Sequence, residues 1–136
     1  MPVKESVKES MKIVKIQGSD RRLYSLIGPL VMDPEVIGMN DGYPFKNTSD
    51  HVWYIAIKGK NKVAGFISVV NNKLCNDFTW QDYELLEDLI QNVLSDMKDG
   101  IVSFIAEQGD IPLLEKLGFA EEKRYVKYVK MIKAIV

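Results

Sequence analysis

Two side chains in the sequence are candidates for proton transfer. His51 follows Asp50 at the start of an apolar segment, and an imidazole that titrates near neutral pH can serve as a general base. Glu107 ends another apolar segment, and a carboxylate buried in an apolar cleft can accept a proton in the working pH range. Each residue also has a simpler interpretation, because polar groups at strand ends are commonly solvated.

Aromatic side chains indicate where a ligand would be contacted. Tyr43 and Phe45 lie in an irregular stretch, residues 38–49, whose Gly, Pro and Asn residues favour turns, so we expect these rings at the rim of a groove. Trp53 and Tyr54 are neighbours in an extended segment and must point to opposite faces, and we predict that Trp53 lines the groove. The alternative is that these rings pack in the core and pin the loop.

Composition excludes several other kinds of site. The lone Cys75 and the single His51 cannot form a Cys/His zinc cluster or an internal disulfide, so no metal site is expected. Eighteen Lys+Arg against 19 Asp+Glu give a net charge of -1, which provides no field for collecting nucleic acid or an anionic membrane. No apolar run approaches the ~20 residues of a membrane span, and the N-terminus lacks the apolar core of a signal peptide. We therefore expect a cytoplasmic protein.

Apolar periodicity predicts the elements that must position these residues. Residues 1–10 repeat a VKES unit with little apolar content and are expected to form a mobile arm, which leaves residues 11–136 as a single domain. Proline at position 29 is expected to kink or split the first helix, and Asp33-Pro34 to start another. The predicted strands are 11–17, 51–58, 62–70, 73–79, 101–107 and one long last strand, 120–133, and the predicted helices are 20–31, a short turn from 34, 85–98 and 112–117.

This order of elements predicts an α/β (α+β) protein. Segments 51–58 and 62–70 are apolar on both faces, which is typical of central strands that are covered on both sides. We therefore expect a central mixed, mostly antiparallel sheet with helices on both faces. A chain of 136 residues can bury about two-thirds of its surface, so it needs no disulfide or metal to fold.

The element order, together with KVAGFISV in residues 62–69 and LLEKLGF in residues 113–119, resembles the GCN5-related N-acetyltransferase (GNAT) superfamily. These enzymes move an acyl group from coenzyme A to an amine. The resemblance extends over residues 11–133 and implies the GNAT fold, acetyl-CoA as the donor and a small-molecule or peptide amine as the acceptor. In many members an Asn stands near the position of Glu107, and a Tyr that protonates the leaving thiolate stands where this chain has Leu114.

The resemblance also locates the expected coenzyme contacts. The family's pyrophosphate signature is Gln or Arg, two variable residues, Gly, one residue, then Gly or Ala, so that backbone N–H groups at a helix start can approach the phosphates. Gln81 fits this signature, whereas Glu84 and Leu86 stand in place of the small residues. An ordinary helix start explains the same segment, because acidic groups favour the helix dipole there. The implied contacts with acetyl-CoA are the strand backbone at Asn76, Asp77 and Phe78, followed by Gln81 and Tyr83.

Two classes of function remain open. One is an acetyl-CoA-dependent N-acyltransferase in which the amine attacks the thioester directly, a reaction that depends mainly on orientation and on donors for the oxyanion. The other is an inactive binding module that keeps the fold without the phosphate clamp, because fold alone does not fix function. A homodimer is also expected, since a single last strand in place of a hairpin would leave an open edge for a second subunit.

Overall fold

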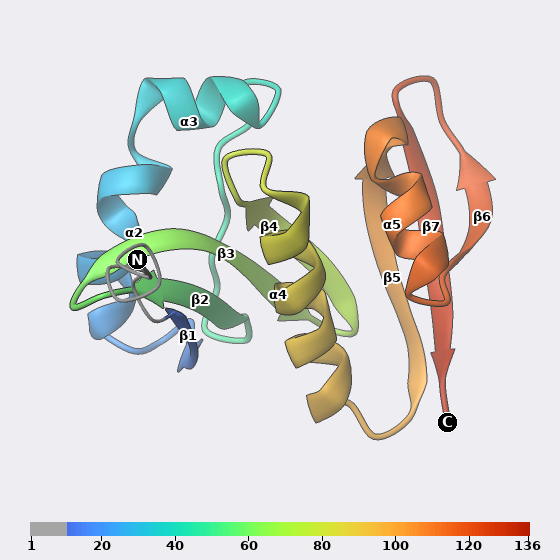
Figure 1. Cartoon of the computed structure of the whole chain (residues 1–136), viewed down its shortest axis with the longest axis horizontal. Helices are drawn as coiled ribbons and strands as arrows, with labels where there is room; N and C mark the ends of the chain where they lie inside the picture. Colours follow the sequence, from blue (N-terminus) through green and yellow to red (C-terminus); the bar gives the residue numbers. More distant parts are fainter. Residues whose placement is uncertain (1–10) are drawn as a thin grey trace, which may run out of the picture.

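In residues 11–136, which the computed structural model describes, seven strands form one sheet in the order β1-β2-β3-β4-β5-β7-β6 (Figure 1). Neighbouring strands run antiparallel except β4 and β5, which are parallel. This confirms the mixed, mostly antiparallel sheet predicted from the sequence. The arm expected in residues 1–10 lies outside the described residues.

The helices and strands follow the apolar segments of the sequence closely. The strands are β1 (Met11–Gln17), β2 (Val52–Lys58), β3 (Lys62–Val70), β4 (Lys73–Phe78), β5 (Gly100–Glu107), β6 (Ala120–Arg124) and β7 (Tyr128–Ile135). The helices are α2 (Arg22–Val31), α3 (Pro34–Met39), α4 (Tyr83–Asp96) and α5 (Ile111–Lys116), with a 3-10 turn, η1 (Gln108–Asp110), before α5. None of the helices described is long and apolar enough to cross a membrane.

Helices cover both faces of the sheet, as predicted. Successive residues of β2 point to opposite sides, so Tyr54 joins the core under α4 and α5 while Ile55 joins the core under α2 and α3. The helix pair α2 and α3 is divided after Val31, and Pro29 lies inside α2 near its end. The carboxylate of Asp33 then accepts a hydrogen bond from the Glu35 N–H at 2.9 Å, which caps α3.

The C-terminal segment differs from its prediction. The single strand expected over 120–133 is wrong, because the chain turns at residues 125–127 and forms the hairpin of β6 and β7. The Tyr125 N–H donates to the Tyr128 carbonyl at 2.8 Å and closes this turn. Every residue of β6 is exposed, so the strand carries no buried face that an apolar pattern could reveal. A homodimer was expected because a single last strand would leave an open edge. Since the chain ends in a hairpin, that reason for a second subunit no longer holds.

Candidate functional site

A cleft opens in the middle of the sheet, where β4 and β5 separate. These two strands pair only at Lys73 with Ser103 and at Leu74 with Phe104. Beyond that point β5 keeps its pairing with β7, while β4 bulges at Asn76, whose φ is +57°. In Figure 1 the ends of β4 and β5 lie apart, with the start of α4 between them. Among residues 11–136, no strand pairs with the edges that face each other across this opening.

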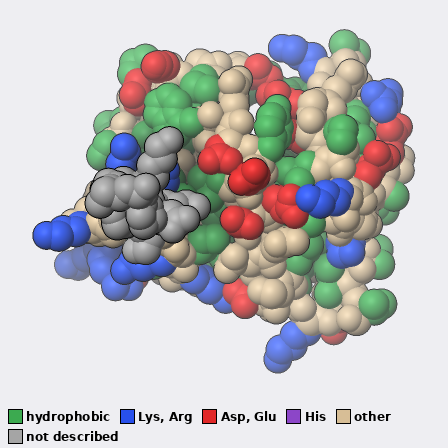
Figure 2. Space-filling model, viewed as in Figure 1, with side chains coloured by type: hydrophobic (Ala, Val, Ile, Leu, Met, Phe, Trp, Pro, Cys, Tyr) green, Lys and Arg blue, Asp and Glu red, His purple; other side chains and the backbone are tan. Residues whose placement is uncertain are grey.

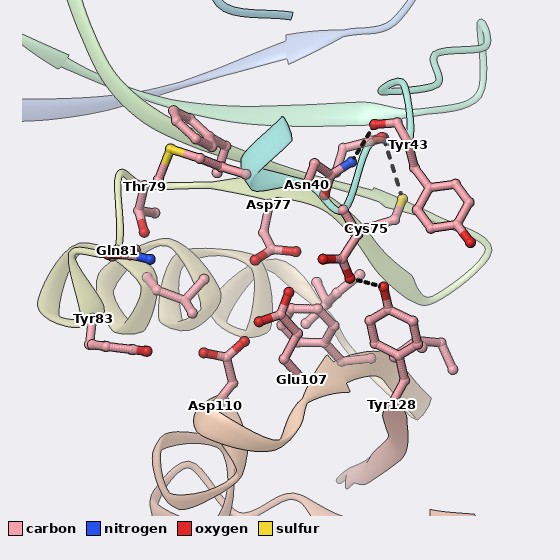
Figure 3. Close-up of a pocket in the computed structure, with 18 of the residues that line it drawn as sticks. Asn40, Tyr43, Cys75, Asp77, Thr79, Gln81, Tyr83, Glu107, Asp110 and Tyr128 are labelled. Carbon is pink, nitrogen blue, oxygen red and sulfur yellow. Dashed lines mark hydrogen bonds between the residues drawn. The ribbon is translucent and has the colours of Figure 1, made fainter. Parts of the chain in front are cut away.

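The cleft has a volume of about 520 Å³ and is walled by four parts of the chain. Strand β4 and the start of α4 form one wall, β5 and η1 form the opposite wall, and the loop after α3 meets β7 at one end (Figure 3). Its lining residues include Asn40, Asp41, Tyr43, Cys75, Asn76, Asp77, Phe78, Thr79, Gln81, Tyr83, Leu86, Phe104, Glu107, Asp110 and Tyr128. Segments that are distant in sequence therefore share one space.

Three carboxylates point into this space from opposite walls. Asp77 comes from β4, Glu107 from the end of β5 and Asp110 from η1 (Figure 3). Burial raises the pKa of Asp77 to about 7, with further contributions from the negative charges of Asp110 and Glu107. Burial, and then the charge of Glu107, raise the pKa of Asp110 to about 6. Asp77 therefore exchanges a proton near neutral pH, which is the property required of a general base.

A phenol and a carboxylate close one end of the cleft. The Tyr128 hydroxyl on β7 donates a hydrogen bond to the Asp41 carboxylate in the loop after α3 (Figure 3). This bond raises the pKa of Tyr128 to about 12, so the phenol stays protonated. The same loop is braced by Asn40, whose side-chain amide donates to the Tyr43 carbonyl at 2.8 Å. The loop after α3, which was predicted to form a rim, is thus bonded to β7 across the cleft.

The side chain of Asn76 holds the bulge of β4 in place. Its amide nitrogen donates to the Lys46 carbonyl at 2.8 Å and to Ser68 Oγ at 2.7 Å, and its oxygen accepts from the Lys46 N–H at 2.9 Å. These bonds leave the backbone of the bulge, and not the Asn76 side chain, for a ligand. Cys75 lies beside it with Sγ 3.2 Å from Ser68 Oγ, and burial raises the pKa of this thiol.

The first turn of α4 is capped by a side chain of the chain itself. The Asp82 carboxylate accepts a hydrogen bond from the Leu85 N–H at 3.0 Å and so caps the helix. Glu84 is exposed in the first turn, and Leu86 is buried in the core at 3% exposure. Figure 2 shows acidic side chains gathered over this part of α4. The segment therefore offers neither small residues nor free positive charge to a diphosphate, and it does not fit that group.

The structure brings together most of the residues proposed from the sequence. Those at the cleft are Glu107, Asn76, Asp77, Phe78, Gln81, Tyr83 and Tyr43, and those outside its lining are His51, Phe45 and Trp53. His51 is buried, and its Nδ1 accepts from the Thr48 N–H at 2.9 Å. Burial lowers the pKa of His51.

The two aromatic residues outside the cleft serve the core instead. Trp53 is 1% exposed, and its Nε1–H donates to Asn47 Oδ1 at 2.8 Å. Phe45 packs edge-on against Phe66 with ring centroids 5.5 Å apart. Both rings fix the loop between α3 and β2 on the sheet, which is the alternative that the sequence left open.

Asp41, Asp110 and Tyr128 are among the cleft residues that were not proposed as site residues from the sequence. Asp110 follows Glu107 by three positions, and this spacing around a turn was the available signal. Asp41 and Tyr128 are 87 positions apart and carry no sequence signal of their meeting. Leu114, which stands where the family resemblance would place a phenol, is fully buried in the core, so this position of α5 supplies no proton donor. No group of His, Cys, Asp and Glu side chains within residues 11–136 is arranged to hold a metal ion.

Comparison with known proteins identifies the fold. Neither family models nor curated sequences give a match to this chain. Among solved structures, it is similar to an acyl-CoA N-acyltransferase from Pseudomonas aeruginosa, with a TM-score of 0.71 and 14% identity over 92% of this chain and 100% of that one. Escherichia coli ElaA gives a TM-score of 0.68 and 11% identity, with 91% and 99% of the two chains covered.

A third similar structure contains the coenzyme. The PaiA N-acetyltransferase from Thermoplasma acidophilum in complex with coenzyme A gives a TM-score of 0.57 and 13% identity, with coverage of 92% of this chain and 99% of that one. The chain therefore has the fold of the GNAT acyl-CoA N-acyltransferases, as the resemblance implied.

Proposed function

We propose that the protein is an N-acyltransferase that moves an acyl group, acetyl in the simplest case, from a coenzyme A thioester to the amine of a small molecule or peptide. The observation that carries this proposal is the opening between β4 and β5, which combines unpaired strand edges with a carboxylate whose pKa lies near 7. The fold shared with acyl-CoA N-acyltransferases supports the proposal. The activity is argued from the cleft itself, because a fold supports many functions.

The β4 side of the cleft suits an extended arm that carries amides. After Leu74 the edge of β4 that faces β5 has no strand partner, so its N–H and C=O groups can pair with a ligand in the way that a further strand pairs with a sheet. Phe78 and Tyr83 border this edge with apolar ring surface. The pantetheine part of coenzyme A is an uncharged arm with two amides, and it fits this wall by chemical type.

The acidic wall suits the amine. Asp110 and Glu107 attract a cationic amine into the cleft, and Asp77 lies where it can take a proton from the attacking nitrogen. When bound, the thioester supplies an activated acyl carbon. The cationic amine first gives one proton to solvent, because only the neutral amine has the lone pair that attacks. Transfer then forms the nitrogen–carbon bond and breaks the carbon–sulfur bond, while the second proton passes from nitrogen to the Asp77 carboxylate. The released sulfur takes a proton from solvent, since Leu114 stands at the position where the family resemblance implies a phenol.

Thiol release from acetyl-CoA in the presence of a panel of diamines, amino acids and peptides tests this proposal. The wild type is expected to release thiol only when an amine is present, and the acetylated product should be found by mass spectrometry. Asp77→Asn should abolish most of the rate, whereas Asp88→Asn, a matched change at an exposed carboxylate of α4 outside the cleft, should not. Absence of amine-dependent thiol release across the panel would contradict the proposal.

The first turn of α4, with its carboxylate cap, favours a second candidate, a GNAT-fold binding module without catalysis. A module would bind amines or thioesters in the cleft without releasing thiol. Calorimetric titration beside the activity assay separates the two candidates.

A further inference from the structure

We infer that the donor is recognised by its acyl-pantetheine end alone and that its nucleotide, including the diphosphate, is left in solvent. This inference rests on the proposed function, because it concerns the donor of the same reaction. The fold resemblance implies a helix start with small residues that binds phosphate, whereas α4 begins with Glu84 and Leu86 at those positions.

The first observation is that the N-terminus of α4 is capped by a carboxylate of the chain itself. A phosphate at a helix start is held by free backbone N–H groups of the first turn. Here the Asp82 carboxylate accepts from the Leu85 N–H at 3.0 Å and so holds a negative charge at the helix start. A diphosphate would have to displace a carboxylate of the chain itself.

The second observation is the lack of room for a close approach. Backbone N–H groups reach around a phosphate where glycines remove the side chains, yet no glycine stands between Gly65 and Gly100. Leu86 cannot move aside, because it is buried in the core with Leu85 and Leu89. The helix start is therefore built as a core element.

The third observation is the sign of the charge. Residues 74–97 contain no Lys or Arg and six carboxylates, namely Asp77, Asp82, Glu84, Glu87, Asp88 and Asp96. Within the described residues, Glu87 is paired with Lys116 and Asp96 with Lys15, and the other four have no ion pair. Lys73 also lines the cleft, at the end where β4 and β5 are still paired. The phosphates of coenzyme A would thus meet repulsion at α4, while an uncharged pantetheine arm would not.

A comparison of two donors tests the inference. The value of kcat/KM is measured with acetyl-CoA and with S-acetylpantetheine, each at low and high salt. We expect the two donors to agree within about threefold, and the value for acetyl-CoA to rise with salt because salt screens repulsion. A preference of about 100-fold for acetyl-CoA, or a value that falls with salt, would overturn the inference.

Calorimetry makes the outcome independent of turnover. If neither donor releases thiol, the proposed function fails, and titration with coenzyme A and with pantetheine still decides the inference. Equal affinities support it. Tighter binding of coenzyme A, or no binding of either compound, overturns it.

Reversing the charge of a side chain at the start of α4 tests whether this helix start repels the phosphates of coenzyme A. Glu84→Lys changes an exposed side chain in the first turn of α4 and should raise kcat/KM for acetyl-CoA about fivefold without changing the value for S-acetylpantetheine. Asp88→Lys makes the same change in charge one turn later, in a shallow hollow near Met11 and Ile13, and should have a smaller effect. An equal response of both variants, or a loss with Glu84→Lys, would show that the start of α4 does not repel the donor.

Discussion

Strands β2 and β3 pair from end to end, whereas β4 and β5 pair at only two positions. The first pair is covered on both faces by apolar side chains, with Ile55 on one face and Ile67 on the other, and both are fully buried. The second pair opens onto Asp77, Glu107 and Asp110. Two neighbouring parts of one sheet thus differ in whether the chain satisfies its own backbone groups.

The difference teaches where a ligand can be recognised in this fold. Backbone groups of a sheet must be paired or solvated, so an opening inside a sheet is stable only when water or a ligand fills it. The opening also places carboxylates in partly buried surroundings, which raises the pKa of Asp77 and of Asp110. The paired half stabilises the protein, and the open half supplies the chemistry.

The largest expected effect comes from removing the base in the open half. Asp77→Asn should lower kcat for acyl transfer by about 10²- to 10⁴-fold, because a positioned general base contributes that much. Steady-state assays with Asp88→Asn as the control measure the effect. A loss of less than about tenfold would assign the proton to another acceptor.

The same substitution should raise stability at high pH. The pKa of Asp77 in the folded protein, about 7, lies above its ordinary value of 3.8, so the folded state holds the proton more tightly than the unfolded state. Stability is therefore lost as the pH rises from about 4 to about 7, and the loss is complete above that range. Asp77→Asn should raise Tm at about pH 8 and leave it nearly unchanged near pH 4. An equal change in Tm at both pH values would contradict the raised pKa.

In the paired half of the sheet, substitution of Gly65 tests how closely neighbouring atoms pack against β3. A Cβ at Gly65 on β3 would lie 2.6 Å from the Phe78 carbonyl and 2.9 Å from Leu85 Cδ2. Gly65→Ala should therefore lower the free energy of unfolding by about 2 to 4 kcal/mol. Gly38→Ala, at a helical position with no atom within 4 Å, should raise it by about 0.5 kcal/mol. Urea denaturation of both variants makes the comparison, and equal effects would contradict the packing.

The neighbours of Asp77 should shift the pH dependence in a fixed order. The rate should fall below about pH 7 as Asp77 becomes protonated, and Asp110→Asn should move this limb to lower pH because it removes the stronger of the two electrostatic causes. Glu107→Gln should move it less, since Glu107 is the weaker of the two electrostatic causes. A shift to higher pH in either profile of kcat/KM would be the contrary result.

The smallest expected effect concerns the hydrogen bond between Tyr128 and Asp41 at the end of the cleft. Tyr128→Phe removes the hydrogen bond to Asp41 and should raise KM for the amine by less than tenfold, with a loss of about 1 kcal/mol in stability. Tyr125→Phe, at an exposed ring in the same hairpin, is the control. The idea that the loop is held by this bond fails if the two variants behave alike.

The sequence predicted the paired half better than the open half for a physical reason. Runs such as HVWYIAIK are apolar on both faces only in a covered strand, so β2 and β3 could be read directly. The turn that separates β6 from β7 was missed, because all side chains of β6 are exposed and no apolar pattern marks where the strand ends. Asp77 was proposed for its backbone, and Asp110 was not proposed, because the divergence of β4 from β5 depends on long-range pairing that no local pattern encodes.

The most direct test of the central claim, that the opening between β4 and β5 is the ligand site, is a titration of ¹⁵N-labelled protein with S-acetylpantetheine followed by two-dimensional NMR. Amide shifts should change at residues 74–78 and 104–107, the facing edges of the opening, and stay constant in β2 and β3. Shifts confined to the paired half of the sheet, or none at saturating ligand, would contradict the claim.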